Sequence, residues 1–225
     1  MPGRLLLAAL LAVGLSLNGG VDTGRAATGT IRGRLTIGVT PRPMDRPSVT
    51  DPTTRRPETV DRRRSVVYLK SGPLEAFYQL RAGRARMDQR GEQFSPRVLA
   101  ITVGTTVDFP NNDITFHNVF SLSRVKHFDL GRYKPGKTGA VRFDQPGIVP
   151  VFCDIHSHMS AYILVFSHPF FSLTDDNGDY AISGIPPGTY TVLVWSELGR
   201  AQPRQVTLSG SETVEADFRV GRDGS

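Results

Sequence analysis

The sequence has a single cysteine, Cys153, among 225 residues. A disulfide framework within one chain is therefore excluded, and so is a structural zinc site that uses two or more thiolates. Five histidines are too few for an enzyme that holds several copper centres. Long hydrophobic runs are scarce too, because no stretch reaches the roughly 18 apolar residues that a membrane-spanning helix needs.

Glycine and proline, in contrast, are abundant, with 23 and 16 residues respectively. This content is high for a helical protein and indicates many turns between short strands. It has no period and is too low for collagen or for global disorder.

The first residues have the layout of a secretory signal peptide. Met1–Arg4 is short and basic, Leu5–Leu17 is apolar, and small residues follow up to Ala26 and Ala27. We predict a signal peptide over residues 1–26; the alternative is an uncleaved anchor. No cysteine follows the cleavage site, so no lipid anchor is expected there. The mature protein is predicted to be periplasmic or secreted, without a stable membrane anchor.

The net charge of +6 is concentrated in one part of the chain. From Arg42 to Arg97 there are 13 basic and 7 acidic residues, a net of +6. Most of this excess lies in and just after Pro41–Arg64, which combines several prolines with several arginines and has no aromatic residue. We interpret it as a solvated loop. Without aromatic residues to stack on bases, and with export predicted, nucleic-acid binding is not expected.

The rest of the chain predicts an all-β protein made of β-sandwiches. Only Leu74–Ala85 could form a helix. Ile148–Phe152 and Ala161–Phe166 are nearly continuous apolar runs, which predicts strands buried on both faces. The other predicted strands are Thr30–Ile37, Ser65–Leu69, Val98–Val103, Thr106–Phe109, Gly139–Phe143, Tyr180–Ile182, Thr189–Trp195, Gln205–Leu208 and Thr213–Val220.

The candidate chemistry lies in the segment FCDIHSHM, between two predicted strands. Cys153, His156 and Met159 are spaced C-x2-H-x2-M, so a thiolate, an imidazole and a thioether share one tight loop. His117, beside a strand of its own, is the candidate for a second imidazole. Two imidazoles and a thiolate with a more distant thioether are a donor set that suits copper.

Other interpretations of these residues exist. A lone cysteine is more often a small buried hydrophobic residue than a ligand, and a methionine near an apolar strand usually belongs to a core. Cys153 as a nucleophile lacks an evident separate base. His158 would point away from a metal bound by its neighbours, and His127 and His168 are expected at the surface.

Residues Met87–Phe166 resemble a small cupredoxin of the plastocyanin, pseudoazurin and amicyanin group. The resemblance depends on F-S-P at Phe94–Pro96, V-G-T-T-V-D-F at Val103–Phe109, N-N-D at Asn111–Asp113, H-N-V at His117–Val119, K-P-G at Lys134–Gly136, F-D-Q-P-G at Phe143–Gly147 and the cysteine loop.

This resemblance implies a Greek-key sandwich that holds one mononuclear copper ion. His117, Cys153 and His156 would be equatorial ligands and Met159 the axial ligand. Asn118 would steady the ligand loop. The implied function is electron transfer through the edge of His156, and no residue set for substrate turnover is visible, so an enzyme is not predicted.

A second resemblance lies in Thr174–Val194, which is similar to the carboxypeptidase regulatory-like domain, a small transthyretin-like sandwich. The family's first strands are matched by Gly29–Ile37 and Ser65–Leu69 at the other end of the chain. We therefore predict a discontinuous domain, 28–72 and 168–220, with a cupredoxin domain inserted at 84–167. The alternative is a tandem arrangement in which Ser65–Leu69 belongs to the cupredoxin.

The sequence is compatible with two functions. The first is an exported copper electron carrier; proteins of this two-part type resemble methylamine-utilisation proteins, which suggests a cytochrome or dehydrogenase partner. The second is a non-catalytic binding or scaffold module, with a protein or glycan partner and a structural or vestigial copper site.

Overall fold

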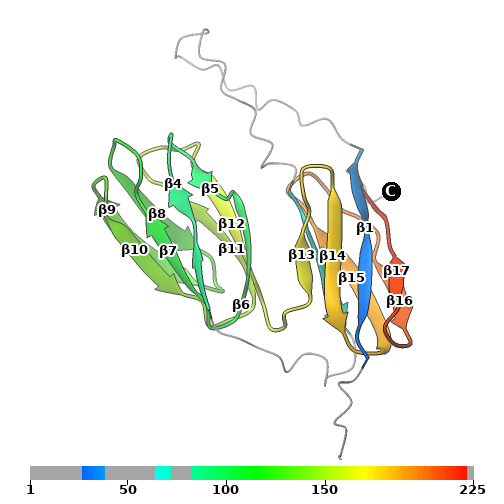
Figure 1. The fold of residues 1–225 in the computed structure, drawn as a ribbon. Helices are drawn as coiled ribbons and strands as arrows, with labels where there is room; N and C mark the ends of the chain where they lie inside the picture. The colour runs from blue at the N-terminus through cyan, green and yellow to red at the C-terminus, as the bar shows by residue number, and fades with distance from the viewer. Residues whose placement is uncertain (1–26, 39–63, 72–82, 222–225) are drawn as a thin grey trace, which may run out of the picture.

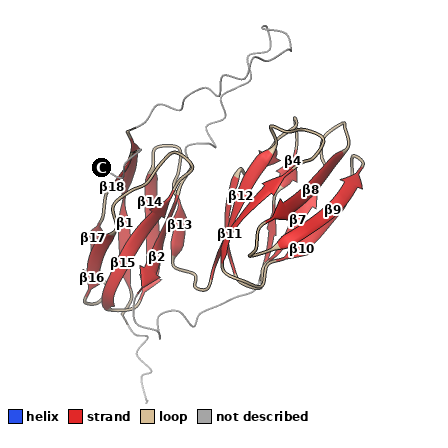
Figure 2. Cartoon of the chain, turned by 180° about the vertical axis from the view of Figure 1, so that it is seen from behind, coloured by secondary structure: helices blue, strands red, loops and turns tan. Residues whose placement is uncertain are grey.

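The computed structural model describes residues 27–38, 64–71 and 83–221. Every regular element within these ranges is a β-strand, which confirms the all-β prediction (Figure 2). Among these residues no helix has the length and apolarity of a membrane span. The predicted signal peptide and all but the last residue of the Pro41–Arg64 segment lie outside the described residues.

The strands form two sandwiches that lie side by side (Figure 1). The first, here called the central sandwich, uses the middle of the chain. A three-stranded sheet with the order β10-β7-β3 faces a five-stranded sheet with the order β6-β12-β11-β8-β9, and β4 pairs with β5. The strands are β3 (Arg84–Arg86), β4 (Asp88–Gln89), β5 (Phe94–Ser95), β6 (Val98–Thr102), β7 (Thr106–Pro110), β8 (His117–Leu122), β9 (His127–Tyr133), β10 (Thr138–Arg142), β11 (Gly147–Phe152) and β12 (Ser160–Phe166).

The second, here called the terminal sandwich, combines strands from both ends of the chain. In one sheet β1 pairs with β14, β17 and β18, and the other sheet has the order β13-β2-β15-β16. Ser65–Leu69 therefore pairs with the C-terminal part of the chain. The strands are β1 (Gly29–Ile37), β2 (Val66–Ser71), β13 (Phe171–Leu173), β14 (Asp179–Ile185), β15 (Gly188–Trp195), β16 (Arg204–Leu208), β17 (Thr213–Glu215) and β18 (Phe218–Val220).

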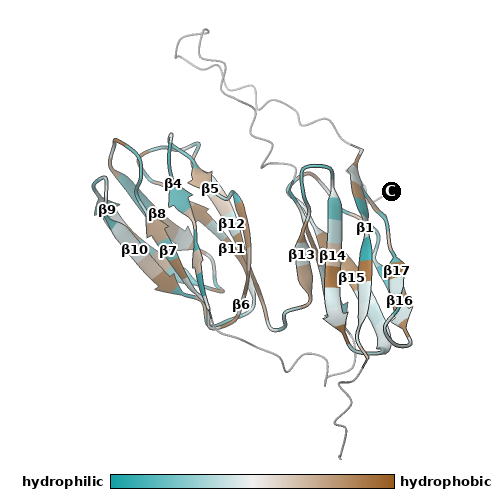
Figure 3. Ribbon diagram, in the orientation of Figure 1, coloured by the Kyte–Doolittle hydropathy of each residue, from teal (hydrophilic) through white to brown (hydrophobic). Residues whose placement is uncertain are grey.

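Each sandwich has its own hydrophobic core. Hydrophobic residues, brown in Figure 3, occur on strands of both. The alternation of apolar and polar residues along a strand explains these cores, because successive side chains point to opposite faces of the sheet. Val141 and Phe143, for example, are two residues apart and are both buried in the core of the central sandwich.

A third hydrophobic cluster joins the two sandwiches. It consists of buried Val66, Val98, Leu164 and Phe166, with partly buried neighbours that include Trp195. The outward-facing side of β12 thus packs against the terminal sandwich, while Ile163 and Val165 of the same strand face the central core. The prediction that β12 is buried on both faces is therefore correct.

The same prediction is wrong for β11. Ile148 and Phe152 are 43% and 38% exposed, because the interface covers β12 but not the outward side of β11. Leu74–Ala85, the one segment that could have formed a helix, does not do so at its described end: Arg84 and Ala85 belong to β3, which pairs with β7. Residues 74–82 lie outside the described residues.

Candidate metal centre

The cysteine loop connects β11 to β12 at one end of the central sandwich. Cys153 follows β11 directly, and Met159 directly precedes β12. The Cys153 N–H donates to the Met159 carbonyl at 3.3 Å, and the Met159 N–H donates to the His156 carbonyl at 2.9 Å. Both side chains at the loop ends are buried in the same core, with Met159 1% exposed. Two backbone hydrogen bonds therefore close the loop without any contribution from a metal ion.

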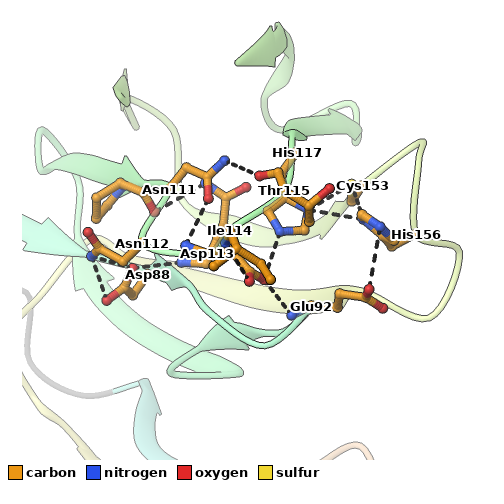
Figure 4. Close-up of polar contacts among 12 residues, drawn as sticks. Asp88, Glu92, Asn111, Asn112, Asp113, Ile114, Thr115, His117, Cys153 and His156 are labelled. Atoms are coloured by element: carbon orange, nitrogen blue, oxygen red, sulfur yellow. Dashed lines mark hydrogen bonds and ion pairs between the residues drawn. The ribbon is translucent and has the colours of Figure 1, made fainter. Parts of the chain in front are cut away.

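Three of the four predicted donors converge. His117 begins β8, which pairs with β11 through Phe120 and Phe152. Its Nδ1 lies 3.0 Å from Nδ1 of His156, and Cys153 Sγ lies 3.9 Å from each of these nitrogens (Figure 4). The three donor atoms lie within 4.8 Å of one another. Two imidazoles and a thiol that face one point fit a borderline or soft metal ion.

The tautomer of a neutral His117 is selected by a contact of its other ring nitrogen. Nε2 lies 3.0 Å from Asp113 Oδ2, and the two side chains are 0% and 9% exposed. A carboxylate can only accept a hydrogen bond, so the neutral imidazole carries its proton on Nε2 and presents the lone pair of Nδ1 toward Cys153 and His156. A carboxylate behind a histidine in this way is typical of metal ligands.

Asp113 is held as the anion. Burial raises the pKa of its carboxyl, but hydrogen bonds from the Glu92 N–H, His117 and the Ile114 N–H outweigh this effect, and the pKa lies below its usual range. The Glu92 N–H donates to Asp113 Oδ2 at 2.7 Å. Asn111 supports the same turn, since its Oδ1 accepts from the Asp113 N–H at 3.0 Å (Figure 4).

Glu92 reaches the outer side of the centre. Its backbone has a φ of 53°, a left-handed conformation that is uncommon for residues other than glycine. One carboxylate oxygen lies 3.7 Å from His156 Nε2 and the other 3.1 Å from His158 Nε2. His156 is 17% exposed, whereas His117 is fully buried, so only His156 connects the donor group to the surface.

Asn118 ties the loop to β8. It is buried, and its Oδ1 accepts from the Asp154 N–H at 2.7 Å. Its Nδ2 donates to Asp129 Oδ1 at 3.2 Å. On the outer side, Arg132 pairs with Asp154 at 2.9 Å. These contacts hold the residue that follows Cys153 from two sides.

The remaining histidines lie elsewhere. His127 is exposed on β9, as expected. His168 was expected at the surface, and this is wrong: it is 7% exposed in the link from β12 to β13. It stacks on Phe170, whose N–H donates to His168 Nδ1 at 3.2 Å, and burial lowers the pKa of the imidazole.

Asp113 and Glu92 were missed as parts of the site. Asp113 had a sequence signal, because a carboxylate four residues before a candidate ligand can support it. Glu92 had none, since it lies far from His156 in the chain and only the fold brings them together.

No family model matches the chain. Solved structures similar to it include a purple cupredoxin from Nitrosopumilus maritimus, with 23% identity over 36% of this chain and 99% of that one and a TM-score of 0.34. A reduced amicyanin mutant has 22% identity, covering 43% and 97% of the two chains, with a TM-score of 0.36. A copper-containing nitrite reductase from Thermus scotoductus SA-01 has 28% identity, covering 36% and 22%, with a TM-score of 0.35.

Proposed function

We propose that this protein is an exported electron carrier that binds one copper ion in the central sandwich, residues 84–167, which has a cupredoxin fold. The observation that carries the proposal is the convergence of His117 Nδ1, His156 Nδ1 and Cys153 Sγ on one point. Met159 would complete the set as the axial donor. A bound copper ion would supply one-electron chemistry at this position.

The protein's own residues would do three things for such an ion. Asp113 keeps the His117 lone pair directed at the donor group. Asn118 and the loop backbone hold Cys153 in place, which limits rearrangement when the charge of the site changes. The burial of Cys153 and His117 excludes water and leaves the partly exposed His156 as the route for electrons.

A redox protein, such as a cytochrome or a dehydrogenase, is the proposed partner. Exposed apolar side chains flank the donors along the chain: Ile114 is 97% exposed, Phe116 53% and Ile155 39%. Such residues are suited to a transient contact beside the partly exposed His156, because removing apolar surface from water is favourable. The signal peptide predicted at 1–26 would direct the protein to the periplasm or out of the cell, and the encounter would take place there.

The terminal sandwich, 28–72 and 168–220, is proposed to be a carboxypeptidase regulatory-like domain into which the copper domain is inserted. The pairing of β1 and β2 with strands after residue 170 supports this division. The turn at Asp175–Asp179 is not a hairpin, because it connects β13 and β14, which belong to different sheets. Its own contacts hold it, since Asp175 Oδ1 accepts from the Asn177 and Asp179 N–H groups.

The test is a visible absorption spectrum of the purified mature protein after addition of Cu(II). We expect a strong band at roughly 600 nm, or a split pair that reaches toward about 450 nm, from copper–thiolate bonding. Cys153→Ser should abolish the band while circular dichroism still shows a folded β-protein. His127→Asn, which removes an exposed imidazole on β9, is the matched control and should keep it.

A folded wild-type protein without such a band would contradict the proposal. The alternative, a binding or scaffold module that does not hold Cu(II) through its thiolate, would then be favoured.

A further inference from the structure

One partly buried ion pair connects the two sandwiches beside the cysteine loop. Arg97, just before β6, donates through Nε and Nη2 to the two carboxylate oxygens of Glu197, just after β15, with both distances 2.8 Å. The side chains are only 17% and 13% exposed. A two-point contact of this kind fixes orientation as well as charge, and it is stronger in a poorly hydrated setting.

The third nitrogen of the same guanidinium contacts the cysteine loop. Arg97 Nη1 donates to the Ser160 carbonyl at 2.7 Å and lies 3.2 Å from Ser160 Oγ. Ser160 directly follows Met159, whose carbonyl accepts the Cys153 N–H. A short path therefore runs from Glu197 through Arg97 and Ser160 to two of the proposed copper ligands.

Two neighbouring contacts support the Glu197–Arg97–Ser160 path. Trp195, two residues before Glu197, packs on Tyr162 of β12 with ring centroids 5.0 Å apart. The Tyr162 N–H donates to the Arg97 carbonyl at 2.8 Å. Arg97 is thus held from the terminal sandwich by Glu197 and from the central sandwich by its own backbone.

We propose that the terminal sandwich positions the metal centre: Glu197 orients Arg97, and Arg97 fixes the Ser160 carbonyl and with it Met159 and Cys153. Glu197 and Arg97 are positioning residues that do not touch the ion. The inference rests on the proposed copper function, but its first test does not need copper.

The first experiment uses the metal-free full-length protein. Amide hydrogen exchange of Cys153 and Met159 is measured by NMR in the wild type, in Glu197→Gln and in Arg97→Lys. A lysine keeps the charge but cannot make the forked contact with Glu197 and also reach Ser160. We expect exchange at both amides to become about tenfold faster, since charge-assisted hydrogen bonds are lost.

The matched control is Asp179→Asn. It breaks another two-point arginine pair, with Arg34, that lies within the terminal sandwich and between exposed side chains. It should leave both loop amides unchanged. Unchanged loop exchange in Glu197→Gln and Arg97→Lys would overturn the inference, whatever the metal chemistry.

The second experiment uses the copper-loaded protein. A Met159 thioether that is held less firmly would stabilise Cu(II) less, so the reduction potential should rise in both variants. A threefold to tenfold change in the Cu(I)-to-Cu(II) affinity ratio is expected, and tenfold corresponds to about 59 mV. Met159→Leu calibrates the direction of the shift.

The outcomes separate the two proposals. If wild-type protein gives no copper–thiolate band, the copper function fails, while the exchange data still decide whether Glu197 holds the loop. In the other case, the band is present in all three proteins. If Glu197→Gln and Arg97→Lys then change neither the position and intensity of the copper–thiolate bands nor the reduction potential of the copper site, the positioning role fails and the copper function stands.

Discussion

At the scale of single residues, Asp113 is a carboxylate within hydrogen-bond distance of a donor residue of the proposed centre. Its contact with His117 Nε2 is buried and 3.0 Å long. Asp113→Asn replaces the anion with a neutral amide, which weakens the donor strength of His117. We expect Cu(II) affinity to fall about 10- to 100-fold, measured by competition with a chelator.

The control for this substitution is Asp144→Asn, which removes a carboxylate that pairs with Arg142 at the surface. Its Cu(II) affinity should equal that of the wild type. Equal affinity of Asp113→Asn and the wild type would show that the carboxylate does not act on the ion through His117.

His168 gives a prediction about pH. Its folded pKa is lowered, so the unfolded chain takes up a proton at a higher pH than the folded protein does. Its contribution to stability is complete above the ordinary histidine pKa of about 6.5 and is lost as pH falls from there toward the folded pKa. His168 alone can change the free energy of unfolding by at most about 1.4 kcal/mol per pH unit.

His168→Asn removes the titration and keeps an oxygen that can accept the Phe170 N–H. Urea unfolding of the metal-free protein between pH 7.5 and 5.5 should show a smaller loss of stability in the variant than in the wild type. Parallel pH profiles of the two proteins would refute this assignment.

At the scale of elements, the loop from β11 to β12 depends on β8 for its position. Asn118 provides this link through the Asp154 N–H. Asn118→Ala leaves that partly buried N–H without its side-chain acceptor, and we expect a loss of about 1 kcal/mol in unfolding free energy together with weaker Cu(II) binding. Thermal unfolding and copper titration measure the two effects.

Asn112→Ala is the matched control, because this amide donates to Asp88 and not to the cysteine loop. We expect it to affect stability less and to leave copper binding unchanged. Similar copper affinities for Asn118→Ala and wild type would mean that β8 does not support the loop.

At the scale of the whole molecule, we expect the hydrophobic cluster of Val66, Val98, Leu164 and Phe166 to make the two sandwiches unfold as one cooperative unit. Leu164 is 2% exposed and lies on the side of β12 that faces the terminal sandwich. Leu164→Ala creates a cavity there, and we expect a loss of about 2–5 kcal/mol. Calorimetry should show one transition in the wild type and two in the variant.

Leu208→Ala is the comparison, since this residue is buried in the core of the terminal sandwich alone. Leu208→Ala should lower the temperature of the single unfolding transition without splitting it into two. Two separate transitions in the wild-type protein would show that the interface does not couple the sandwiches.

The sequence by itself determined the strand-rich class, the positions of most strands, and the spacing of Cys153, His156 and Met159. These features are local, because alternation, turn residues and short spacings act between neighbours in the chain. The strand beside His117, β8, was expected without bounds. The strand β9 has polar side chains mixed with the apolar ones, and β3 to β5 and β13 are very short, so their patterns were too weak to predict.

Only the tertiary structure decided which residues meet across the chain. It buried one face of β12 but not of β11, placed His117 against the cysteine loop, and brought Asp113 and Glu92 to the histidines. It also joined Arg97 to Glu197, 100 residues apart. Such contacts depend on how sheets pack and on what covers them, and a single strand's pattern carries no information about its distant neighbours.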